Sequence, residues 1–176
     1  MKIVQGLKKL RVIEKRMAKG IEEIQVLSSA LSNEKPVMGN EEKQETEVKS
    51  LVQSNFDLVE EYLRLKLALE KTNLEVSTSI SGEARTLSEW LVIRRKLGST
   101  MLSTVGAMND RAAENRRTLN RGLTPEGQAV HVVRFYDEKT KMDRLRQLTD
   151  RLEAIDGKLE VVNATTNVVG YENVEE

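Results

Sequence analysis

The sequence contains no cysteine, two prolines, a single histidine and 3% aromatic residues among its 176 residues. Without cysteine there are no disulfides, thiolate metal sites or cysteine nucleophiles, and one histidine excludes a multi-histidine zinc site within one chain. Lys plus Arg and Asp plus Glu both total 28, whereas nucleic-acid-binding modules usually show a basic excess. We therefore expect no nucleic-acid partner, no metal and no cofactor.

Long apolar runs are also missing. No stretch approaches the ~18 apolar residues of a membrane-spanning helix, and charged residues such as Lys8, Lys9 and Arg11 interrupt the N-terminal segment, which disfavours a secretory signal. The sequence predicts a soluble protein that is made in the cytoplasm.

What the chain does have is 32% charged and 39% apolar residues, a composition that favours long helices. Apolar residues recur every three or four positions along four segments, which is the spacing of an amphipathic helix. The length fits a single domain. The predicted helices of this single domain, 1–176, span residues 2–32, 41–75, 86–116 and 138–162.

The ends of these segments carry helix-capping residues. Asn40 and Asp137 are good N-caps, and Thr86 with Glu89 fits the capping box. Within the second segment Asn55 interrupts the apolar stripe, which leaves two interpretations. A buried Asn would set register or oligomeric state, whereas an Asn at the helix edge would face solvent.

The helical pattern breaks between residues 117 and 136. Residues 130–136 are β-branched and aromatic and predict a short strand. Because a lone strand cannot satisfy its own backbone groups, it would pair with something, such as another copy of the chain. The alternative is an extended loop lying over the helices. The polar tail, 163–176, is expected to be mobile.

The predicted fold class is therefore all-α: an antiparallel bundle of four long helices with coiled-coil character and a short β segment between helices three and four. Few aromatic residues leave a thin core per chain, so we expect a homo-oligomer. Small residues on the third helix and apolar residues of the predicted strand form the candidate oligomer interface: Gly98, Gly106, Val130, Val132 and Phe135.

Motifs for catalysis are sparse. Phosphate-binding glycine loops, H-E-x-x-H and G-x-S-x-G are all absent. His131 is interpreted as structural or exposed, and acidic pairs such as Glu60–Glu61 as part of a solvated helix surface. The basic region, 94–121, either binds an anionic partner or balances acids within the bundle, and we favour the second interpretation. The sequence thus predicts no catalytic residue.

Polar residues at or near apolar stripe positions are the other notable feature. A buried Arg requires charged or hydrogen-bonded partners. We therefore predict a structural polar network at one end of the bundle, made of Asn73, Arg94, Asp156 and Asn163.

Two blocks resemble the septicolysin-like family of bacterial helical proteins. One joins Leu69–Asn73 through a Ser/Thr/Gly loop to Thr86–Leu97, and the other is Asp150–Thr166. Ala164 stands where the family tends to have Trp, and the predicted strand lacks the family's Glu-Ile-Lys. The resemblance implies a helical, oligomeric protein. The family's haemolysin-like name implies pore formation, which would need a membrane-entering segment.

The sequence favours a non-enzymatic structural or assembly subunit, which self-associates or packs with other protein subunits in a larger complex such as a phage virion. A septicolysin-like, membrane-active protein is the alternative. An enzyme or nucleotide-binding protein that uses the basic region is a third and weaker hypothesis.

Overall fold

The computed structural model describes residues 1–119, 124 and 127–171. The chain divides into two compact units, where the sequence predicted one domain. Unit 1 comprises Met1–Ser77 and Glu160–Glu176, and unit 2 comprises Thr78–Leu159. Because each unit has its own packing, they are described in turn.

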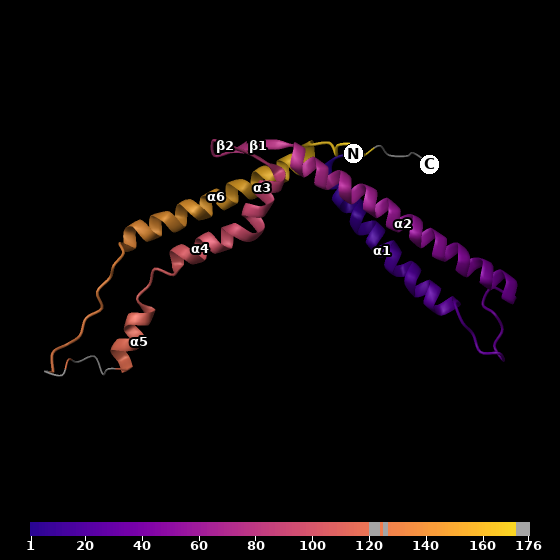
Figure 1. The fold of residues 1–176 in the computed structure, drawn as a ribbon, viewed down its shortest axis with the longest axis horizontal. Helices are drawn as coiled ribbons and strands as arrows, with labels where there is room; N and C mark the ends of the chain where they lie inside the picture. Colours follow the sequence, from indigo (N-terminus) through magenta and orange to yellow (C-terminus); the bar gives the residue numbers. More distant parts are fainter. Residues whose placement is uncertain (120–123, 125–126, 172–176) are drawn as a thin grey trace. The chain divides into compact units, whose positions relative to one another are not determined.

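Unit 1 is built on helices α1 (Ile3–Leu27) and α2 (Glu41–Glu75), which form an antiparallel pair (Figure 1). The Asn40 side chain accepts a hydrogen bond from the Lys43 amide at 2.8 Å, so the predicted N-cap is confirmed and α2 has its predicted bounds. Helix α1 ends five residues before the predicted position 32, at the run of small residues that follows Leu27.

The core of unit 1 lies between α1, α2 and the last residues of α6 (Glu138–Thr165). At Gly6 the helices pack so closely that an added Cβ would lie 3.2 Å from Leu69 Cδ2. The buried apolar residues of the unit are Ile3, Leu10, Ile13, Leu65, Ala68, Leu69, Val162 and Val168.

The segment after α6 is fixed to the start of α1. The Ile3 amide donates to Thr166 O at 3.0 Å, the Val168 amide donates to Met1 O at 2.9 Å, and Lys2 and Asn167 form an antiparallel bridge. The expectation of a mobile tail is therefore wrong for residues 166–169, because their backbone groups are paired. Residues 172–176 lie outside the described part of the chain.

Unit 2 begins with a β-hairpin of strands β1 (Ser77–Ile80) and β2 (Glu83–Thr86). Ser81 and Gly82 both have positive φ, 51° and 83°, as the tight turns of two-residue hairpins require. The predicted strand at 130–136 is not a strand: its described backbone is irregular. The Ser/Thr/Gly connection forms the sheet instead, because its own turn brings two strands together without a distant partner.

Helices α3 (Leu87–Val92) and α4 (Gly98–Gly106) run on through a π-helical turn, η1 (Ile93–Leu97). Thr86 and Glu89 form the predicted capping box. The Thr86 amide donates to Glu89 Oε2 at 2.8 Å. This hydrogen bond is the main cause that lowers the pKa of the Glu89 carboxylate below its usual value.

The predicted helix 86–116 is broken after α4. The Asn109 side chain accepts from the Arg111 amide at 3.0 Å and donates to Ala107 O at 3.0 Å, so the backbone turns before α5 (Arg111–Leu119). Asn competes in this way with helical hydrogen bonding. The sequence predicts a continuous helix here because the apolar residues keep their three- and four-residue spacing across the break.

Helix α6 packs antiparallel to α3–η1–α4 within unit 2, as two contacts show. Arg94 forms an ion pair with Asp156, and Gly98 lies against Leu152. The all-α-dominated class is thus confirmed, together with a small two-stranded sheet. A four-helix bundle is not confirmed, since the long helical segments fall into two units with separate packing.

Candidate interaction surface

Helix α2 carries a row of exposed apolar side chains, called here the α2 stripe. Phe56 is 63% exposed and Leu74 is 64% exposed, while Val59, Leu63 and Leu67 are 45–55% exposed. Apolar surface that is contiguous and exposed marks an interaction site more often than scattered single residues do. The stripe consists of Phe56, Val59, Leu63, Leu67 and Leu74, which are exposed, and of Val52, which is half-buried, with Glu70 as its one charged member.

The α2 stripe lies on a different face of the helix from the core. Leu65, Leu69 and Thr72 are buried within unit 1, and at 100° per residue the stripe is rotated by about 155° from them. Helix α2 therefore has two apolar faces, whereas a helix at the surface of a monomer needs one. The sequence pattern predicts a single apolar stripe on this helix, and a second set of three- and four-residue intervals is the signal that identifies the other face.

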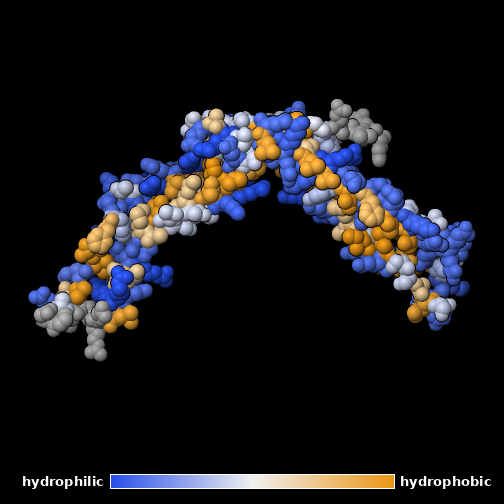
Figure 2. All heavy atoms as spheres, viewed as in Figure 1, coloured by the Kyte–Doolittle hydropathy of each residue, from blue (hydrophilic) through white to orange (hydrophobic). Residues whose placement is uncertain are grey.

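The apolar surface continues toward α1. A groove of about 240 Å³ is lined by Ile24 of α1 and by Val52, Asn55, Phe56 and Val59 of α2. On α1, Leu7 and Ile21 are 43% and 49% exposed. Figure 2 shows apolar residues exposed along the α1–α2 pair.

Asn55 lies between α1 and α2. Its Oδ1 atom is buried, and a Cβ added at Gly20 would lie 3.1 Å from it. Among the described residues this oxygen has no hydrogen-bond partner. Asn55 is thus half-buried at the contact between α1 and α2, where Gly20 provides the room for it, and a role in setting register or oligomeric state stays a prediction.

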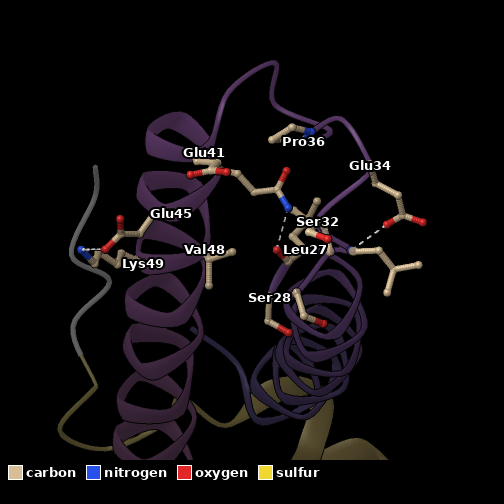
Figure 3. Close-up of a pocket in the computed structure, with 13 residues that line it drawn as sticks. Leu27, Ser28, Ser32, Glu34, Pro36, Glu41, Glu45, Val48 and Lys49 are labelled. Carbon is tan, nitrogen blue, oxygen red and sulfur yellow. Dashed lines mark hydrogen bonds and ion pairs between the residues drawn. The ribbon is translucent and has the colours of Figure 1, made fainter.

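The open end of the α1–α2 pair contains a hollow of about 480 Å³ (Figure 3). Gln44 is buried there, and its Nε2 donates to Leu27 O at 2.9 Å. The amide of Leu31 donates to Glu34 Oε2 at 3.0 Å. The first bond attaches the last residue of α1 to α2, and the second closes a turn within the 28–40 loop, so we assign this end a structural role.

The predicted polar network is distributed over both units. Arg94 and Asp156 are paired within unit 2, and Asn73 and Asn163 belong to unit 1. The ion pair is about half exposed, where such pairs stabilise a protein by roughly 0–1 kcal/mol. A network of all four residues stays a prediction.

The predicted oligomer interface has one member that is engaged within the chain. Gly98 is buried, and an added Cβ would lie 2.6 Å from Leu152 Cδ2, so its small size serves the packing of α4 on α6. Gly106 is exposed with open space around it. Val130 and Phe135 are 36% and 97% exposed, and Val132 is half-buried; their role in an interface stays a prediction.

Asp110 organises the end of α4 and the loop before α6. Its carboxylate accepts from Arg134 Nε at 2.7 Å and from the Tyr136 hydroxyl at 2.9 Å. The Arg134 hydrogen bond is the main cause that lowers the pKa of Asp110. Partial burial, followed by the hydrogen bond to Asp110, raises the pKa of Tyr136 to about 12.

We expect acid to release this loop. A carboxylate whose pKa is lowered by folding stabilises the folded state above its unfolded pKa, near 3.8 here, and that contribution is lost as the pH falls further. Acid titration of unfolding, with Asp110→Asn as the comparison, should show a steeper loss of stability below pH 3.8 in the parent. Equal slopes for both proteins would contradict the assignment.

The other candidate residues from the sequence, His131 and the basic region, form no reactive cluster among the described residues. His131 is exposed, and of the basic region Arg94 and Arg117 are paired with Asp156 and Glu114, while Arg121 lies outside the described residues. In the described part of the chain no group of His, Asp and Glu is arranged to hold a metal ion.

None of the helices in the described ranges has both the length and the apolar character needed to cross a membrane. No protein-family model, no curated protein and no solved structure matches the chain.

Proposed function

We propose that the protein is a non-enzymatic assembly subunit that associates with other protein chains, its own copies included, through the α2 stripe. The observation that supports this most is a second apolar face on a helix whose first face is already buried in unit 1. Burying exposed apolar surface is favourable by about 25 cal/mol per Å². A structural role uses that surface directly, without a reactive pocket.

The septicolysin-like resemblance supports the same proposal, since it implies a helical, oligomeric protein. The same resemblance is also the basis for the alternative proposal, a membrane-active protein. A more specific proposal is that the larger assembly is a phage virion. An assembly surface on a charge-balanced helical chain is compatible with such a role.

A charge placed in the α2 stripe should weaken self-association. Leu67 is 55% exposed, so Leu67→Glu leaves the fold intact but buries an unpaired carboxylate in any interface at that position. We expect at least about a tenfold rise in the dissociation constant, equivalent to about 1.4 kcal/mol, in light scattering and native mass spectrometry over a dilution series.

Val37→Glu is the matched control. Val37 is 72% exposed in the loop between α1 and α2, so it receives the same charge outside the stripe and should associate like the parent. A parent that stays monomeric at every concentration would overturn the proposal. Release of dye from anionic vesicles by the parent, with no protein multimer formed, would favour the membrane-active alternative instead.

A further inference from the structure

We infer that the occupant of the α2 stripe is the α2 stripe of a second copy, lying antiparallel with a two-fold axis beside Leu63. This inference rests on the proposed function and specifies its partner and geometry. It follows from the spacing of the stripe, from its length and from the charges at its edge.

The spacing is symmetric about Leu63. Val59 and Leu67 lie four residues before and after it, and Val52 and Leu74 lie eleven residues before and after it. In an antiparallel pair related by a two-fold axis at Leu63, Val59 of one copy faces Leu67 of the other. Val52 likewise faces Leu74, and Leu63 faces itself, as an isologous interface requires.

The stripe also runs straight. Its intervals are four, three and four residues, repeated once, and eleven residues make slightly more than three turns of an α-helix. Apolar side chains therefore stay on one line along the 22-residue rise from Val52 to Leu74, about 33 Å. Two such helices can remain in contact over the full length with little supercoiling.

Charges beside the stripe fit the same register. Glu60 and Arg64 border the stripe on one edge, and antiparallel helices place the same edge of both copies side by side. With the axis at Leu63, Glu60 of one copy and Arg64 of the other lie about 3 Å apart along the helix direction. Each Arg64 thus has Glu60 of the other copy beside it, and this opposite charge offsets the approach of the two Arg64 side chains, which lie equally close along the helix direction.

Glu70 is the one mismatch, because it lies opposite Phe56 of the other copy in this register. Its carboxylate is already paired with Lys66 Nζ at 3.5 Å, so the charge can be turned toward the edge of the interface. A tolerated but unfavourable residue there lowers the affinity without changing the register.

Cysteine cross-linking tests the register directly, because the chain has no cysteine of its own. Packed helix axes lie about 8–10 Å apart and Cα atoms about 2.3 Å from each axis, so residues that face each other have Cα atoms about 5 Å apart, within disulfide range. With a copper–phenanthroline oxidant, Leu63→Cys should form a covalent dimer in most chains.

Val59→Cys and Leu67→Cys are the matched controls. Each lies about 12 Å along the axis from its own symmetry mate, beyond the reach of a disulfide, so neither should cross-link alone. An equimolar mixture of the two variants should cross-link, since Val59 of one copy faces Leu67 of the other. The mixed product is identified by mass.

The outcomes separate this inference from the proposed function. Cross-linking by Leu63→Cys and by the mixture, but not by either control alone, supports the two-fold pairing. A protein that self-associates without this pattern, or with Phe56→Cys as the efficient self-linking variant, overturns the pairing and leaves the assembly role in place. A protein that is monomeric before oxidation overturns both.

Discussion

Replacing Trp90 with Ala is expected to cost about 3–5 kcal/mol of folding free energy. Trp90 is fully buried in unit 2, and its Nε1 donates to Thr78 O of β1 at 3.1 Å. Its ring therefore attaches the β-hairpin to α3, with the Arg85 guanidinium 5.8 Å from the ring centroid. Truncation leaves a large cavity and an unpaired carbonyl together, which places this substitution among the most destabilising in the chain.

Urea unfolding followed by circular dichroism measures the loss, because Trp90 is the sole tryptophan and its fluorescence disappears with it. Trp90→Phe is the control: it keeps most of the apolar volume but removes the Nε1 donor, and should cost markedly less than the Ala variant. A cost below about 1 kcal/mol for Trp90→Ala, the level of a surface change, would contradict the role of the ring.

Thr72→Val is expected to cost about 1–3 kcal/mol, although the two side chains have nearly the same shape. Thr72 is fully buried; its Oγ1 donates to Ala68 O at 2.7 Å and accepts from the Val169 amide at 2.8 Å. Valine leaves that amide buried without an acceptor, and the penalty for an unsatisfied group is larger than the average worth of a hydrogen bond.

Thr72→Ser separates the oxygen from the methyl group, since it keeps the acceptor and loses one methyl, about 0.8 kcal/mol of burial. Hydrogen exchange of the Val169 amide should be faster in the Val variant and unchanged in the Ser variant. If serine destabilised unit 1 more than valine, packing and not the hydrogen bond would hold the C-terminal segment.

The sequence was most informative where local chemistry decides the structure. Asn40 and the Thr86–Glu89 pair specify helix starts through their own side chains: Asn40 is the N-cap of α2, and Thr86 and Glu89 form the capping box of α3. The bounds of α2 follow from the Asn40 cap at one end and from the β-forming residues after Glu75 at the other. These features depend on neighbours within a few residues.

Features that depend on distant partners could not be predicted in the same way. The α2 stripe has the same intervals as a core stripe, and only the position of α1 shows which face is free. Gly98 looked like a contact for another subunit, but Leu152, 54 residues later in the chain, occupies that space. The residues at 130–136 have strand composition without a partner strand in the described residues.

The hydrogen bonds between Ile3 and Thr166 and between Met1 and Val168 affect the order in which the chain can fold during synthesis. Unit 2 is one continuous segment, Thr78–Leu159, and all of its contacts are available once that segment has left the ribosome. Unit 1 needs residues from both ends of the sequence, and closing so long a loop is slow compared with local pairing. During translation, α1 and α2 therefore remain with an edge of their core uncovered until residues 160–169 have been made, and this is the period in which a chaperone would find a binding site on the nascent chain.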